Sequence, residues 1–276
     1  MADSARAPLR ITIVQGPFLP VPPLRGGAIE KAMVALGREW ARDGHAVTHL
    51  SRRFPGLPDA ETVAGVRHVR VPSVDMPAGK VAFRWHELRY CLAVRRALPP
   101  GDVVLANLVL LPLLPLPRAA GRLFLYLARQ PKRQVGLYLQ AAGLLAASQA
   151  VADGVRRVAP WMAARTHVVH TPLANAFAVG TVERAREILY AGRIHPEKGI
   201  ETAIDAFRRL APDHPGWRLR LIGPWREAEG GAGAGYRDAL RARAGDAAIT
   251  IDEPIYDGAA LAEAYARASL FAYPSV

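Results

Sequence analysis

The chain has 276 residues, of which 51% are apolar and 22% are charged. This composition excludes collagen-like, disordered and repeat-array proteins, and the length is that of two domains. The formal net charge is +12, and only four of the 36 basic residues are lysines. The basicity therefore comes almost wholly from arginine.

The excess positive charge lies in the first part of the chain. Residues 1–178 hold 23 Lys or Arg against 10 Asp or Glu, a net +13, whereas residues 179–276 hold 13 against 14, a net −1. Two interpretations stay open: an anionic partner, such as a phospholipid surface or a lipid-phosphate acceptor, and an arginine-rich background without a partner. Nucleic-acid binding is not expected, because no recognition motif accompanies the basic residues.

Cysteine and histidine usage argues against metal sites and disulfides. The single cysteine, Cys91, excludes an internal disulfide and a cysteine-based zinc site, and the eight histidines show no zinc spacing. Residues 1–9 lack the apolar core of a signal peptide, and the apolar run 103–117 is too short and too rich in proline to span a membrane. We therefore expect a cytoplasmic protein whose membrane contact, if it has one, is peripheral and at the inner face.

Short apolar runs alternate with segments of helical period, the pattern of parallel sheets covered by helices. Strands are expected at 9–15, 46–51, 67–71, 103–106, 123–127, 144–147, 167–170, 187–191, 218–222, 249–251 and 270–273. Helices are expected at 27–43, 81–98, 148–158, 199–210, 236–244 and 258–267. The pattern restarts after residue 178, which predicts two α/β domains with doubly wound parallel sheets, 1–178 and 179–276. The second has no closing helix and is expected to be incomplete.

The first candidate site is the pair Gly26 and Gly27, between the first strand and the first helix. Glycine lets the backbone approach a ligand, and the free N–H groups of a helix start favour an anion such as diphosphate. An ordinary turn at a helix start explains the pair equally well.

The second candidate is stronger and follows the strand 187–191. Arg193 and Lys198 flank a proline-containing turn just before a new helix. The carboxyl end of a parallel strand is where open α/β sheets bind ligands, and an arginine with a lysine suits a diphosphate whose charge grows as it leaves. The alternative is a solvated turn.

Two other segments carry weaker signals. The glycine-rich run 230–235 does not follow a strand directly and is expected to be a flexible surface loop. The segment 81–98 combines aromatic and aliphatic residues with four arginines. It is either a core-packed helix with a solvated face or a helix at a lipid headgroup boundary.

Together these segments resemble the family 4 glycosyltransferases of the GT-B fold, in which two Rossmann-like domains face a cleft. The resemblance covers essentially the whole chain. It rests on Gly26-Gly27, Gly44-His45-Ala46-Val47-Thr48, the stretches 102–107 and 146–151, and above all Tyr190-Ala191-Gly192-Arg193-Ile194-His195-Pro196-Glu197-Lys198-Gly199.

The resemblance implies a hexosyl transfer from a UDP- or GDP-sugar to an acceptor, with retention of configuration, no metal and no cofactor besides the donor substrate. Arg193 and Lys198 would be the catalytic pair that neutralises the donor diphosphate, and Gly26 and Gly27 would approach that diphosphate. The resemblance further assigns Gly223, Pro274 and Ser275 to the donor side, Ile255 to the surroundings of the nucleobase, and Glu30 and Asn107 to the acceptor side. The acceptor would be lipid-linked or otherwise anionic.

The sequence also departs from the family pattern. A histidine expected after the strand 123–127 is replaced by Ala128-Arg129-Gln130, the family's Asn-Gly at the end of the first domain reads His170-Thr171-Pro172, and its pair of glutamates after Pro-Ser lies beyond Val276. Three functions therefore stay open: a glycosyltransferase, a non-catalytic nucleotide-sugar-binding subunit, and a peripheral protein of anionic membranes.

Overall fold

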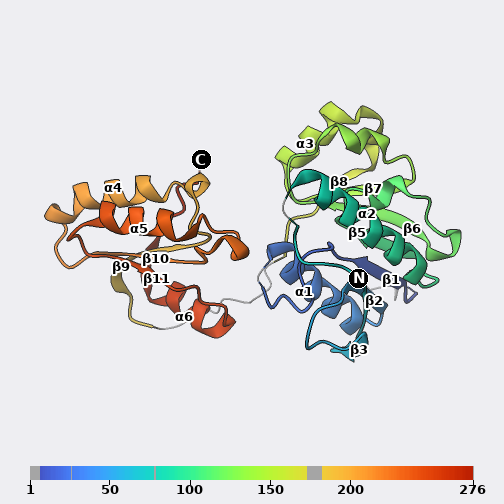
Figure 1. Cartoon of the computed structure of the whole chain (residues 1–276), viewed down its shortest axis with the longest axis horizontal. Coiled ribbons are helices and arrows are strands. Elements are labelled where there is room, and N and C mark those ends of the chain that lie inside the picture. Colours follow the sequence, from blue (N-terminus) through green and yellow to red (C-terminus); the bar gives the residue numbers. More distant parts are fainter. Residues whose placement is uncertain (1–6, 26, 78, 173–181, 276) are drawn as a thin grey trace, which may run out of the picture. The chain divides into compact units, whose positions relative to one another are not determined.

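The computed structural model describes residues 7–25, 27–77, 79–172 and 182–275. The chain divides into two compact units, Met1–Ala174 and Asn175–Val276 (Figure 1). The predicted domain boundary, between residues 178 and 179, lies outside the described residues. Each unit contains its own sheet and its own core, as the restart of the sequence pattern predicts.

The first unit is built on an eight-stranded sheet in the order β3-β4-β2-β1-β5-β6-β7-β8, in which only the β3–β4 pair is antiparallel. Its strands are β1 Arg10–Val14, β2 Ala46–Arg52, β3 Ala60–Val63, β4 Val66–Val71, β5 Val103–Ala106, β6 Arg122–Leu127, β7 Ala141–Ala146 and β8 Thr166–Val168. The order reverses beside β1, since β2 pairs with one edge of β1 and β5 with the other.

Helices cover both faces of this sheet. They are α1 Ala28–Arg42, α2 Lys80–Ala97 and α3 Gln149–Val158, with short 3-10 turns at Leu111–Leu113, Arg118–Ala120, Arg133–Leu137 and Pro160–Arg165. Successive strand residues point to opposite faces. Ile13 of β1 accordingly packs with Met33 of α1, whereas the next residue, Val14, belongs to the core under α2 and α3.

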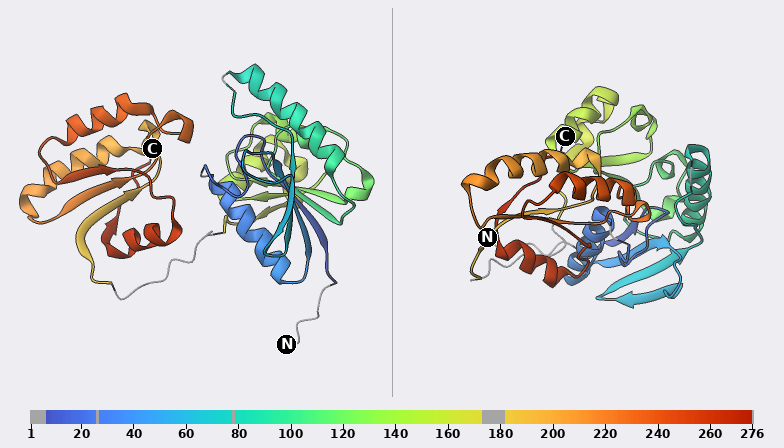
Figure 2. Two further views of the ribbon diagram at one scale, coloured as in Figure 1. Left: turned by 60° about the horizontal axis from the view of Figure 1, so that its bottom comes forward. Right: turned by 60° about the vertical axis from the view of Figure 1, so that its left-hand side comes forward.

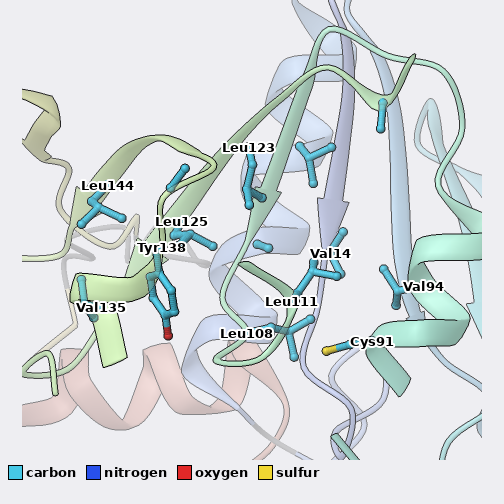
Figure 3. Packing of buried hydrophobic residues seen from close by; sticks show 14 of the residues in the cluster. Val14, Cys91, Val94, Leu108, Leu111, Leu123, Leu125, Val135, Tyr138 and Leu144 are labelled. Carbon is cyan, nitrogen blue, oxygen red and sulfur yellow. The ribbon is translucent and has the colours of Figure 1, made fainter. Parts of the chain in front are cut away.

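The larger core lies between the sheet and α2 and α3. Cys91 and Val94 of α2 point inward toward Val14 and Leu111 (Figure 3). All four side chains are buried, and removing such apolar surface from water is the main driving force for folding.

The second unit has a four-stranded parallel sheet in the order β11-β10-β9-β12. Its strands are β9 Ala185–Ala191, β10 Arg218–Ile222, β11 Ile249–Asp252 and β12 Ala268–Phe271, and its helices are α4 Ile200–Leu210, α5 Gly233–Ala244 and α6 Gly258–Arg267. Short 3-10 turns lie at Pro196–Lys198, Ala211–Asp213 and Glu227–Glu229. The alternation repeats here, because Tyr190 packs on the face of α4 and α5 and Leu189 packs on the face of α6.

Two local expectations differ from the structure. The edge strand β3 was not predicted, because its four residues are mostly exposed and show no apolar run; it joins the sheet through a turn in which Ala64 and Gly65 have positive φ. The run 230–235 was predicted as a surface loop, which is wrong from Gly233 onward, where α5 begins. The preceding glycines are also fixed: Gly231 N–H donates to the Arg226 carbonyl, and a Cβ on Gly231 would lie 2.2 Å from the backbone of Trp225.

Within the described residues, none of the helices combines the length and the apolar character needed to cross a bilayer.

Candidate functional site

The strongest candidate site lies in the second unit, where the strand order reverses. β9 is the first strand of its sheet, and the chain continues to β10 on one side and to β12 on the other. The carboxyl ends of β9 and β12 therefore flank the topological switch point, the position at which open α/β sheets bind ligands. The turn with Arg193 and Lys198 follows β9, and Pro274 and Ser275 follow β12.

The turn after β9 is held by backbone and side-chain hydrogen bonds. The Tyr190 hydroxyl donates to the Arg193 carbonyl at 2.7 Å, and Ile194 N–H donates to the Pro224 carbonyl at 2.9 Å. His195 Nδ1 accepts from Glu197 N–H at 3.4 Å and caps the short turn Pro196–Lys198. Gly199 then adopts a φ of 64°, which favours glycine, and α4 begins.

The two predicted cations share one carboxylate. Glu197 Oε1 lies 2.5 Å from Arg193 Nη2 and 3.4 Å from Lys198 Nζ. Burial acts to raise the pKa of Glu197, but Arg193 and Lys198 outweigh it and hold that pKa below its ordinary value. Two cations that converge on one carboxylate can converge in the same way on the oxygens of a diphosphate.

The end of β12 packs against this turn. Ser275 Oγ donates to the Glu197 carbonyl at 3.0 Å, and a Cβ on Gly199 would lie 2.0 Å from the Pro274 carbonyl oxygen. Lys198 Nζ lies 5.6 Å from the centre of the Tyr273 ring, a cation–π contact. The predicted donor-side residues Pro274 and Ser275 are thus next to the predicted cations.

Gly223, at the end of β10, is brought to the same edge. A Cβ on Gly223 would lie 1.7 Å from the Gly192 carbonyl oxygen, so no other residue fits there without displacing backbone. Ile255 is placed differently from the other predicted residues. It is half-buried and packs against the small core of Leu189, Ile222, Ala264 and Ala268.

A charged aromatic cluster at the ends of β10 and β11 was missed at the sequence level. The guanidinium carbons of Arg226 and Arg237 lie 4.3 and 3.9 Å from the centre of the Trp225 ring. Trp225 Nε1 donates to Glu253 at 3.1 Å, and Arg226 pairs with the same carboxylate. The signal in the sequence is that Trp225 and Glu253 follow closely on the ends of two predicted neighbouring strands.

In the first unit, Glu30 is buried beneath the glycine turn. Gly26 lies outside the described residues, whereas Gly27 has a φ of 99°, and a Cβ on it would lie 2.2 Å from Glu30 Oε2. Gln15 Nε2 donates to Glu30 Oε1 at 3.1 Å, and His49 Nε2 donates to Gln15 Oε1 at 3.3 Å. The carboxyl group of Glu30 therefore supports the turn at the start of α1.

Asn107 follows β5, the other strand at the reversal point of the first sheet. Its Oδ1 atom is buried and has no hydrogen-bond partner among the described residues. A polar atom in this state is expected to accept a hydrogen bond from a ligand or a water. No three His, Cys, Asp or Glu side chains of the described chain cluster as metal ligands would.

Comparison with known proteins gives the fold first. Sucrose-phosphate synthase from Thermosynechococcus elongatus superposes with a TM-score of 0.68 at 18% identity, over 96% of this chain and 75% of that one. HepE of Anabaena, solved in complex with UDP and glucose, superposes with a TM-score of 0.66 at 13% identity, over 97% of this chain and 74% of that one. The chain has the GT-B fold of these glycosyltransferases.

Sequence comparison finds a family match in the second part of the chain. The profile of the Glycosyl transferases group 1 matches residues 174–276, a range that includes the whole second unit. A stretch of 71 residues is 32% identical to an exopolysaccharide phosphotransferase of Streptomyces coelicolor and covers 26% of this chain but only 7% of that protein. The second unit is thus similar to the group 1 glycosyl transferases in sequence, and both units match their fold.

The close approach at Gly223 predicts an effect on stability. We expect Gly223→Ala to lower the free energy of unfolding by about 3 kcal/mol or more, because the new Cβ must displace the Gly192 carbonyl. The matched control is Gly235→Ala: this site in α5 has open space, so alanine should raise stability by about 0.5–1 kcal/mol. Urea unfolding of both variants tests this, and equal stabilities would contradict it.

The buried histidine predicts a pH dependence. Burial, with the nearby His68 and Arg70, lowers the pKa of His49 to about 3. The unfolded chain binds a proton at His49 below pH ~6.5 and the folded chain does not, so stability is lost as the pH falls from 6.5 toward 3. When the pH is lowered from 7.5 to 5, we expect the free energy of unfolding of His49→Gln to fall by about 1–2 kcal/mol less than that of the parent, as measured by urea unfolding.

The exposed His214, changed to Gln, is the control and should lose stability like the parent. An acid dependence of His49→Gln as steep as that of the parent would contradict the assignment.

Proposed function

We propose that this chain transfers a hexosyl group from a nucleotide diphosphate sugar, with UDP or GDP as the nucleotide, to an acceptor bound by the first unit. The observation that carries the proposal is the pair Arg193 and Lys198, gathered on one carboxylate at the switch point of the second sheet. That sheet belongs to the part of the chain that matches the group 1 family.

Arg193 and Lys198 are the residues to which we assign the chemistry. The bond between sugar and diphosphate breaks with growing negative charge on the diphosphate, and two fixed cations stabilise that charge more than they stabilise the ground state. The first turn of α4, which starts directly after Gly199, adds free N–H groups, whose partial positive charge also favours an anion. In this scheme the diphosphate takes the place that Glu197 holds between the two cations.

The nucleotide is assigned to the neighbouring strand ends, where Gly223 lies. The complex of HepE with UDP and glucose supports a nucleotide sugar as the donor. We assign Gly26 and Gly27 to the diphosphate and Glu30 and Asn107 to the acceptor side, with Glu30 acting through the turn that it supports. Retention of configuration and independence of metal belong to the proposal as implied by the family resemblance.

The first unit's excess of arginine supports an acceptor that is anionic or lipid-linked, handled at the inner face of a membrane. A non-catalytic nucleotide-sugar-binding subunit is the second candidate. It is favoured by the segment Ala128-Arg129-Gln130, which stands where the family resemblance leads one to expect a histidine.

Nucleotide binding tests the proposed site. We expect titration of the chain with UDP or with GDP to show binding that Arg193→Ala or Lys198→Ala weakens by about 2 kcal/mol, roughly thirtyfold, because each removes a charged contact to phosphate. Arg209→Ala is the control: Arg209 is an exposed arginine of α4 and should leave the affinity unchanged. Equal affinity in all three variants would overturn the assignment, and binding without sugar release would favour the non-catalytic subunit.

A further inference from the structure

Helix α2 of the first unit carries an apolar stripe on its outward face. Val81, Trp85, Leu88 and Leu92 follow at spacings of four, three and four residues and so lie along one side of the helix. The exposed fractions are 86% for Val81, 57% for Trp85 and 37% for Leu92.

The opposite side of α2 already faces the core. Tyr90 and Val94 are almost fully buried there, and Cys91 and Val94 point toward the sheet in Figure 3. Figures 1 and 2 show α2 along the outside of the first unit. The helix thus has two apolar sides, and among the described residues the core cluster includes side chains of only one of them.

A shallow groove of about 520 Å³ opens along the outward stripe, and its wall is almost wholly apolar; it is lined by Lys80, Val81, Arg84, Trp85, Leu88 and Leu110. The loop before α2 adds the exposed side chain of Met76. An amphipathic helix of a globular protein turns its apolar side inward, so an outward stripe of this size marks a surface that meets a partner.

Basic side chains border the stripe on both sides. At about 100° per residue, Arg84 and Arg95 lie along one edge and Arg89 and Arg96 along the other. The helix contains one acid, Glu87, which is buried, pairs with Arg84 and accepts from the N–H groups of Val109 and Leu110. The outward face therefore presents cations around an apolar centre without an exposed carboxylate of its own helix.

Arg84 pairs with Glu87, and Arg95 Nε donates to the Pro115 carbonyl, whereas Lys80, Arg89 and Arg96 are available to an external anion. No described residue forms an ion pair with Lys80, Arg89 or Arg96. The acid in the preceding loop, Asp75, is occupied by Arg52 and Arg25. The charge of the face is thus not cancelled locally.

We propose that the outward face of α2 docks flat on an anionic phospholipid surface. Val81 and Trp85 enter the boundary between headgroups and acyl chains, and the flanking arginines contact lipid phosphates. A dissolved polyanion would satisfy the arginines but would leave Trp85 and Val81 in water, so the combination of charge and apolar stripe favours a membrane. The proposal rests on α2 alone and is independent of the donor site in the second unit.

The test is sedimentation of the 276-residue chain with vesicles of phosphatidylcholine alone or mixed with phosphatidylglycerol. We expect binding to the mixed vesicles only, and weaker binding as salt rises. The double variant Val81→Ser with Trp85→Ser, called the stripe variant below, should bind on the order of tenfold more weakly, because it removes the inserted apolar surface. Trp161→Ser with Leu210→Ser is the matched control, since both side chains are exposed outside α2, and it should bind like the parent.

The charge arm uses Arg89→Gln with Arg96→Gln, for which we expect about fivefold weaker binding per arginine. Arg209→Gln with Arg267→Gln removes the same charge from the second unit and should have no effect.

Two further measurements keep the result interpretable. Brominated lipids should quench tryptophan fluorescence in the parent and much less in Trp85→Phe. Titration with UDP should give the same affinity for the parent and the stripe variant, which separates this surface from the donor site and reports on folding.

Equal sedimentation with neutral and anionic vesicles, no sedimentation with either, or undiminished binding of the stripe variant would each overturn the proposal. Heparin binding that is as strong as vesicle binding, and equally strong in the parent and the stripe variant, would also overturn the proposal. That result would identify a site for dissolved polyanions.

Discussion

The candidate site depends on close contact between backbone segments at one edge of the second sheet. Gly223 lies against the Gly192 carbonyl and Gly199 lies against the Pro274 carbonyl, at distances that leave no room for a side chain. These contacts fix the turn after β9 between the ends of β10 and β12. Because the backbone is fixed, the positions of the two positive charges depend only on the side-chain conformations of Arg193 and Lys198. Both side chains meet on Glu197.

The first unit repeats the same arrangement with a different means of support. Its sheet also reverses at its first strand, and the turn after that strand is again closed by glycine. Here a buried chain of polar groups, Glu30, Gln15 and His49, lies beneath the turn. Burial raises the pKa of Glu30, although hydrogen bonds act against that change, so the carboxyl group is more easily neutral than an exposed one.

Helix α2 connects core, loop and surface in the first unit. Its inner side completes the larger core, and its Glu87 accepts two backbone N–H groups of the loop that follows Asn107. Its outer side is basic and apolar. The inner side matches the interpretation of this segment as a core helix, and the outer side carries the apolar stripe and the arginines on which the membrane proposal rests.

The parallel strands are predictable from the sequence alone, because a strand covered on both faces is a continuous apolar run. The turn with Arg193 and Lys198 is also predictable, since residues that follow a buried strand must lie at the edge of the sheet. Three features are visible in the folded chain but were not predicted: Glu30 supports a turn, Trp225 and Glu253 form a cluster, and residues 233–235 start a helix. The Gln15–Glu30 and Trp225–Glu253 hydrogen bonds join different elements of the chain, which local residue patterns do not encode. The start of α5 lies in a run of glycines, whose low helix propensity favours a loop.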